Sequence, residues 1–142
     1  MSLSNSRVNP NIQNHYFDYN GTYLAWEHIS IAHSNSSTAS SSNAPLHPLI
    51  ILHGWGASKK IMRPLGRTLA MHHDCYVIDL AGFGESSKPP VAWRINDYVD
   101  SIKAWVEHIG LDTFDILAHS FGGRITLKLL TQAWSKKHVK KV

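Results

Sequence analysis

The chain contains three short, continuous apolar runs, a pattern typical of strands buried on both faces of a parallel sheet. These runs are residues 49–52, 75–80 and 114–118. They alternate with segments in which apolar residues recur at helical spacing. These segments are residues 64–71, 95–109 and 121–134. Strand and helix in alternation predict a mostly parallel sheet with flanking helices, an α/β fold.

Before the first apolar run, the pattern favours an antiparallel hairpin. Residues 15–19 and 22–31 have the composition of two strands, and Asn20-Gly21 between them is a two-residue turn signal. The polar residues 1–12 are expected to form a disordered leader, so that the folded domain spans residues 13–142. The Ser-rich residues 34–44 are expected to form a flexible loop.

Several residues are expected to mark where elements begin and end. Pro64 suits the first turn of a helix, Asn96 can cap the start of the next, and Gly110 can end it. Residues 138–142 read as the opening of a further strand. Without a neighbour, the strand at 114–118 would present an apolar edge and favour aggregation.

Composition narrows the function classes. The 142 residues are 43% hydrophobic and 17% charged, as in a globular protein. The net charge of +4 equals the four lysines in the last seven residues, which argues against nucleic-acid binding. No apolar stretch reaches the ~18 residues of a membrane span, and no signal peptide is evident, so we expect a cytoplasmic protein. Cys75 is the single cysteine, and the ten histidines show no metal-ligand spacing, so neither metal nor cofactor is expected.

The junction after the third apolar run carries the strongest chemical signal. Ser120 lies where a buried strand runs directly into a helix, with the small residues Ala118 and Gly122 on either side. Such a turn presents the serine hydroxyl above the sheet, and the helix N-terminus directs free N–H groups toward developing negative charge. His119 is expected to pack beside this turn and not to act as its base.

The loops after the other two runs are rich in glycine. In residues 53–56 (His53, Gly54, Trp55 and Gly56), the glycines allow a backbone N–H to face the serine. In residues 79–86, Gly82 and Gly84 direct the loop path and Asp79 is expected to brace it. The carboxyl ends of parallel strands lie at one edge of the sheet, so all three loops should meet there.

The three loops, in this order and each after a buried strand, resemble the N-terminal part of an α/β-hydrolase-fold enzyme. The resemblance covers residues 13–142 and implies that Ser120 is the nucleophile. It also implies that the N–H groups of Trp55 and Phe121 form the oxyanion hole, with a small-molecule acyl compound as substrate. The elbow has Ala118 where the family pattern has glycine, a mild departure.

The resemblance further implies a catalytic acid and then a histidine after the serine. This sequence has no Asp or Glu after Ser120, and its only later histidine, His138, is at the wrong end of a strand. We therefore expect an incomplete fold, truncated before the acid and base, and inactive by itself. Three functions remain open: a serine hydrolase for ester, thioester, amide or activated C–C bonds, an acyltransferase of the same fold, or a non-catalytic fragment or binding module. Epoxide and haloalkane hydrolases of this fold use an aspartate nucleophile, so the serine argues against both.

Overall fold

A computed structural model describes residues 9–31 and 45–142. Most of the predicted leader and the whole Ser-rich segment 34–44 lie outside the described residues. The elements in chain order are β1 (Asn11–Tyr19), β2 (Thr22–Ser30), β3 (Pro48–Leu52), α1 (Lys59–Leu69), β4 (Asp74–Ile78), α2 (Ile95–Ile109), β5 (Asp115–Ala118), α3 (Phe121–Leu130) and α4 (Ala133–His138).

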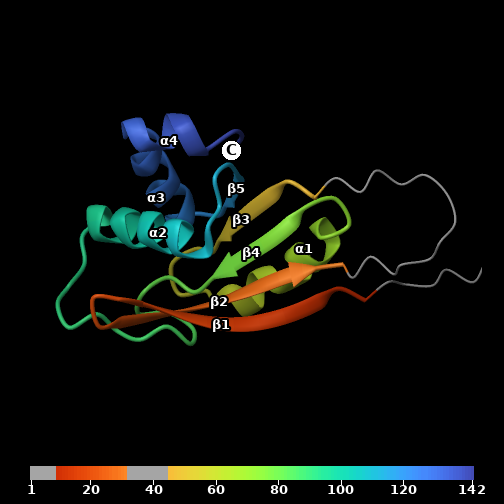
Figure 1. The fold of residues 1–142 in the computed structure, drawn as a ribbon. Coiled ribbons are helices and arrows are strands. Elements are labelled where there is room, and N and C mark those ends of the chain that lie inside the picture. The colour runs from red at the N-terminus through yellow and green to blue at the C-terminus, as the bar shows by residue number, and fades with distance from the viewer. Residues whose placement is uncertain (1–8, 32–44) are drawn as a thin grey trace, which may run out of the picture.

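The strands form one five-stranded sheet in the order β1-β2-β4-β3-β5. β4, β3 and β5 are mutually parallel, and the β1–β2 hairpin joins them through an antiparallel pairing of β2 with β4. This arrangement confirms the predicted α/β class with its N-terminal hairpin (Figure 1). The adjacent strands β4 and β3 each have a hydrogen-bonded neighbour on both sides, and their side chains pack on both faces of the sheet, which explains their continuous apolar runs.

Helices cover both faces of the sheet (Figure 1). On one face, α2 and α3 pack on the strands, and the largest fully buried side chain, Trp105 of α2, belongs to this cluster. On the other face, α1 packs through Met62 against a smaller cluster. Successive residues of β3 alternate between the two, with Ile50 in the first cluster and Ile51 in the second, as the two-residue period of a strand requires.

The hairpin is longer than predicted. Its register pairs Asn11 with Ser30 and continues without a break to Tyr19 with Thr22. The expectation that the leader reaches residue 12 was therefore wrong for its last two residues. Nothing in the local sequence at 11–14 indicates a strand; the partner strand β2 supplies a hydrogen-bonding edge along its whole length, and these residues pair with it.

One helix start and one helix cap differ from the prediction. α1 begins at Lys59, so that Pro64 lies within the helix and not in its first turn. The early start is supported from outside the helix, because Asp79 Oδ1 accepts a hydrogen bond from the Lys59 N–H. α2 begins at Ile95, and Asp97 caps it by accepting a hydrogen bond from the Arg94 N–H at 2.6 Å, so Asn96 is not the cap. Gly110 ends α2 in the left-handed conformation, as predicted.

The helix predicted to run to Trp134 is broken into α3 and α4. Gln132 is extended (φ −92°, ψ 142°), and the chain turns there. The turn brings residues 138–141 alongside β5, where Phe114 donates to the His138 carbonyl and Ile116 to the Lys141 carbonyl. Val139 and Phe114 form a parallel bridge. The strand expected over residues 138–142 is thus reduced to this single bridge, because His138 still belongs to α4, but the tail covers part of the edge expected to be open.

Candidate active site

The three loops predicted to carry chemistry follow the carboxyl ends of β3, β4 and β5, which lie together at one end of the sheet. Direct contacts join them. His119 donates its N–H to the Leu52 carbonyl at 3.0 Å, and Gly122 donates to the His53 carbonyl at 3.1 Å. Leu80 donates its N–H to Nε2 of His53 at 2.9 Å. The loops therefore form one connected site.

Ser120 has φ 52° and ψ −110°, a region that L-residues rarely adopt. Among the described residues, only Asn20 of the hairpin turn shares a positive φ without being glycine. The Ser120 residue is exposed, and α3 begins at the next position. A strained serine held at the start of a helix is a feature that persists only where the surrounding structure enforces it.

Gly122 shows how the surroundings enforce this turn. A Cβ atom built on Gly122 would lie 2.8 Å from the carbonyl oxygens of both Leu52 and His53. No side chain fits there, because the first turn of α3 rests directly on the end of β3. Ala118, on the other side of the serine, ends β5 and is partly buried. The small residues of the elbow therefore have a steric basis.

The loop after β3 approaches the serine closely at Gly54. A Cβ atom built there would lie 3.2 Å from Cβ of Ser120 and 2.8 Å from Nδ1 of His119. The His119 ring thus lies against this loop, although the residue is exposed. Gly56 has a positive φ of 71°, which lets the chain turn toward α1. Hydrogen bonds in the two described segments use neither the Trp55 N–H nor the Phe121 N–H.

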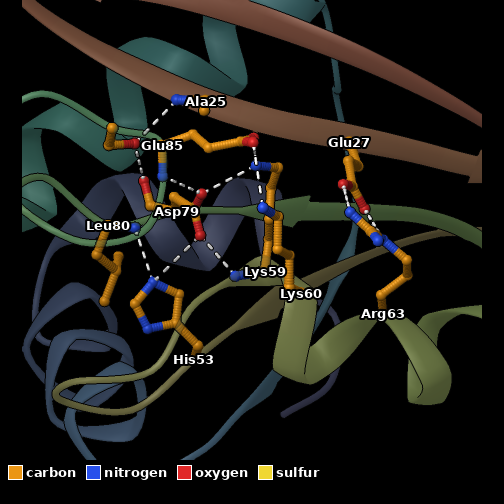
Figure 2. Close-up of polar contacts among 10 residues, drawn as sticks. Ala25, Glu27, His53, Lys59, Lys60, Arg63, Asp79, Leu80 and Glu85 are labelled. Carbon is orange, nitrogen blue, oxygen red and sulfur yellow. Dashed lines mark hydrogen bonds and ion pairs between the residues drawn. The ribbon is translucent and has the colours of Figure 1, made fainter.

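The loop after β4 is built around Asp79, which is 1% exposed. Its carboxylate accepts hydrogen bonds from the Glu85 N–H at 2.9 Å and from Lys59 Nζ at 3.0 Å (Figure 2). A Cβ atom on Gly84 would lie 2.3 Å from this carboxylate, and Gly84 and Gly82 both have positive φ. Both carboxylate oxygens of Asp79 thus accept hydrogen bonds that hold this loop and the start of α1, in agreement with the bracing role expected for it.

Sequence reasoning missed Lys59, which is also 1% exposed. Its ammonium contacts Asp79 and Glu85 together (Figure 2). Burial would lower the pKa of Lys59, but hydrogen bonds to these two carboxylates outweigh it and raise the pKa. The hydrogen bond to Lys59 in turn lowers the pKa of Glu85. No periodicity marks a buried lysine; its place at the first turn of a helix after a glycine-rich loop is the only local signal.

Aromatic rings line the same end of the sheet. The Trp55 ring is 70% exposed and makes edge-to-face contacts with Phe83 at 5.0 Å and Phe121 at 5.2 Å between centroids. Phe121 in turn contacts Tyr98 of α2 at 5.1 Å. The two residues whose N–H groups are free of partners in the described segments thus also meet through their side chains. These contacts form an aromatic cluster that joins the β3 and β4 loops to the start of α3.

The described residues supply no acid and base at this site in the predicted order. His138 ends α4, its Nδ1 lies 2.6 Å from the Asp112 carbonyl oxygen, and its own carbonyl accepts from Phe114 at the start of β5. Ser120 follows the opposite end of that strand. Across residues 9–31 and 45–142, no three His, Cys, Asp or Glu side chains come together as metal ligands. No helix in those segments has the length and apolar character needed to cross a bilayer.

A mixed sheet whose parallel strands end in a strained serine and two glycine-rich loops defines an α/β protein with a nucleophile-elbow type of junction. Residues 47–142 match the family described as "alpha/beta hydrolase fold". The chain belongs to this α/β-hydrolase family.

Relatives of this chain carry the names of different enzyme activities. The chain is 34% identical over 99 residues to the Homo sapiens protein named 1-acylglycerol-3-phosphate O-acyltransferase ABHD5, covering 67% of this chain and 27% of that protein. It is 30% identical over 79 residues to a soluble epoxide hydrolase of Corynebacterium, covering 56% and 28%. The chain therefore spans about a quarter of the length of these relatives.

Solved structures show the same fold. Cfl2 from Burkholderia cenocepacia superimposes with a TM-score of 0.76 at 18% identity, covering 95% of this chain and 41% of that one. The epoxide hydrolase CorEH superimposes with a TM-score of 0.74 at 22% identity, covering 91% and 40%. These similarities establish the architecture and leave the reaction to the residues of the site.

Proposed function

We propose that the chain carries the nucleophile and oxyanion hole of a serine hydrolase that acts through an acyl-enzyme. The observation that carries this proposal is the exposed, strained Ser120 at the N-terminus of α3. Beside it, the N–H groups of Trp55 on the β3 loop and of Phe121 at the first position of α3 have no partner within residues 9–31 and 45–142. Substrates of this chemistry are esters, thioesters, amides and compounds with activated C–C bonds. The aromatic rings of Trp55, Phe83 and Phe121 favour an apolar acyl group.

In the proposed reaction, Oγ of Ser120 attacks the acyl carbon and its proton passes to a general base. The carbonyl oxygen becomes an oxyanion that accepts hydrogen bonds from the two backbone N–H groups. One such donor contributes roughly 3 kcal/mol to stabilising the transition state. Collapse of the intermediate expels the leaving group, which takes the proton, and water then releases the acid.

The proposal needs a base and an acid from outside this sequence, since no Asp or Glu follows Ser120. Removing the histidine of a serine triad lowers kcat by about 10⁶-fold. We therefore propose that the 142-residue chain binds and orients acyl compounds but has no steady-state turnover. Reading the coding sequence beyond codon 142 for a later carboxylate and histidine tests whether a longer product completes the triad.

A direct test uses the chain itself with a fluorophosphonate probe and imidazole as the external base. We expect mass spectrometry to find the phosphonate on the peptide that contains Ser120, and no adduct there in Ser120→Ala. Arylboronic acid, which forms a tetrahedral adduct with an activated serine, should shift the backbone amide resonances of Trp55 and Phe121. Labelling spread over surface serines, unchanged in Ser120→Ala, would contradict the nucleophile assignment.

Acyl transfer is the second candidate, favoured by the 34% identity to the protein named as a 1-acylglycerol-3-phosphate O-acyltransferase. The relative named as an epoxide hydrolase is less relevant to the chemistry, because that reaction in this fold uses an aspartate nucleophile and position 120 is serine. Product analysis separates the two candidates. With a triad-complete protein, a p-nitrophenyl ester and 1-acylglycerol-3-phosphate together, a transferase forms the diacyl product, whereas a hydrolase releases the free acid. A binding module forms neither.

A further inference from the structure

His53 is a completely buried polar side chain to which the proposed reaction assigns no step. Nδ1 lies 2.7 Å from the Gly54 carbonyl oxygen. Nε2 lies 2.9 Å from the Leu80 nitrogen, which donates its N–H (Figure 2). A ring nitrogen that accepts a hydrogen bond carries no proton, so the proton of a neutral imidazole resides on Nδ1. His53 is therefore held as one tautomer, donating to Gly54 and accepting from Leu80.

The charge state agrees with this geometry. Burial lowers the pKa of His53, against smaller opposing effects of the Gly54 carbonyl and Asp79. Nε2 lies 4.0 Å from Oδ1 of Asp79, too far for a hydrogen bond. The Asp79 carboxylate is instead occupied by Lys59 and the Glu85 N–H. Nothing in these contacts places a second proton on the ring.

The hydrogen bond to Gly54 determines how the next peptide lies. The Gly54 carbonyl accepts from Nδ1 of His53 and also from the Ala57 N–H at 3.1 Å. The described residues contain no cis peptide bond, so the Gly54–Trp55 peptide is trans and its C=O and N–H point in opposite directions. Fixing the carbonyl on the His53 side therefore turns the Trp55 N–H away from His53. That N–H is one of the two proposed oxyanion donors.

The same ring also connects two loops. Through Nε2 it holds the Leu80 backbone at the start of the Asp79 loop, and its edge contacts Phe83 with centroids 5.7 Å apart. Gly54, whose carbonyl it holds, lies against Ser120. The His53 side chain thus joins the loop that carries Gly54 to the Asp79 loop, and the same Gly54 lies against Ser120.

We infer that His53 is the positioning residue of the oxyanion hole: its Nδ1–H fixes the Gly54–Trp55 peptide so that the Trp55 N–H is available to the oxyanion. This inference rests on the proposed function. It assigns distinct roles to the two ring nitrogens, with Nδ1 serving the reaction through Gly54 and Nε2 serving the stability of the Asp79 loop.

Two amide substitutions separate these roles. The amide of His53→Asn places an N–H donor near the position of Nδ1 and leaves Leu80 without its acceptor. The longer side chain of His53→Gln places an acceptor near the position of Nε2 and leaves the Gly54 carbonyl without the side-chain donor. His28→Asn is the matched control, because His28 is a partly buried histidine of β2 paired with Asp74, near the opposite end of β4.

The first measurement is the rate of phosphonylation of Ser120 by the fluorophosphonate probe with imidazole, per folded molecule, with thermal unfolding recorded in parallel. We expect His53→Gln to slow labelling about 10²- to 10³-fold, the effect of losing one oxyanion donor, and His53→Asn to stay within about tenfold of the unsubstituted chain. His28→Asn should lower the unfolding temperature without slowing labelling. Equal rates in the two His53 variants would overturn the inference.

The second measurement depends neither on labelling nor on a variant that folds. Nitrogen NMR of the unsubstituted chain should find the His53 proton on Nδ1, with the pKa of the ring below that of an ordinary histidine. A proton on Nε2 would overturn the inference. Absence of labelling at Ser120 in the unsubstituted chain, with the His53 proton on Nδ1, would contradict the proposed function alone. The positioning role is then tested by the Trp55 amide resonance, which should shift in His53→Gln and stay close to its original position in His53→Asn.

Discussion

The ammonium of Lys59 lies 3.0 Å from Oδ2 of Asp79, and both residues are 1% exposed. Lys59 begins α1, where the loop after β3 ends, and Asp79 begins the loop after β4 (Figure 2). The pair therefore holds these two loops of the candidate site together. A buried charge that loses its partner is costly, because it keeps its desolvation penalty without the compensating attraction.

We expect Asp79→Ala to lower the free energy of unfolding by about 3–5 kcal/mol, since Lys59 then keeps only the more exposed Glu85 as a partner. The matched control is Glu85→Gln, whose side chain is 43% exposed. It should cost about 1 kcal/mol or less. Urea denaturation of the three proteins measures the difference. Similar costs for both substitutions would contradict a central role for Asp79.

Gly122 and Gly123 form a second matched pair. A Cβ on Gly122 would lie 2.8 Å from backbone oxygens of β3 and its loop, whereas one on Gly123 meets nothing within 4 Å. Gly122→Ala should therefore destabilise the protein by about 3 kcal/mol or more and displace the elbow. Gly123→Ala, within α3, should be neutral or stabilising by about 1 kcal/mol. Thermal unfolding of both variants checks the contrast, and comparable stability would show that the elbow is looser than described.

The pair of His28 with Asp74 predicts a pH dependence. Burial acts to raise the pKa of Asp74, but hydrogen bonds from His28 and Tyr76 outweigh it and hold the pKa below the usual value. A carboxyl group with a lowered folded-state pKa stabilises the fold above its unfolded pKa of about 4 and loses that contribution as the pH falls through the folded value.

We therefore expect stability to decrease below about pH 4 and this decrease to be smaller in Asp74→Asn. The exposed Asp112→Asn is the control and should leave the slope unchanged. The effect is recorded as the denaturation midpoint of each protein at a series of pH values from about 2 to about 6, on either side of the reference carboxyl pKa. Identical slopes in Asp74→Asn and the unsubstituted chain would rule out this contribution.

Cys75 should be unreactive in the folded chain. It is fully buried on β4, and burial raises the pKa of its thiol to about 12. Because the thiolate is the reactive form, a disulfide reagent at pH 8 should modify the native protein only as fast as it unfolds. In guanidinium chloride the single cysteine should react at once. Rapid reaction of the native chain would indicate that β4 is accessible.

The sequence was sufficient for features that depend on local pattern. Continuous apolar runs identified β3, β4 and β5, because a strand packed on both faces has no polar side. The glycines around Trp55 and Ser120 identified the loops, because close backbone approach excludes larger residues. The start of α1 could not be predicted, because Pro64 suggested a later first turn and the bond from Lys59 to Asp79 spans twenty residues.

Tertiary structure alone decided the buried polar contacts. Glu27 is completely buried on β2 and pairs with Arg63 of α1, yet in the sequence both look like surface residues. The proton position on His53 likewise depends on Leu80, from another strand's loop. A chain's own order specifies its periodicity and its turns, and these determined the sheet and the loops at its end. The energy of a buried charge or tautomer depends on partners distant in sequence, so those could be known only once the strands were side by side.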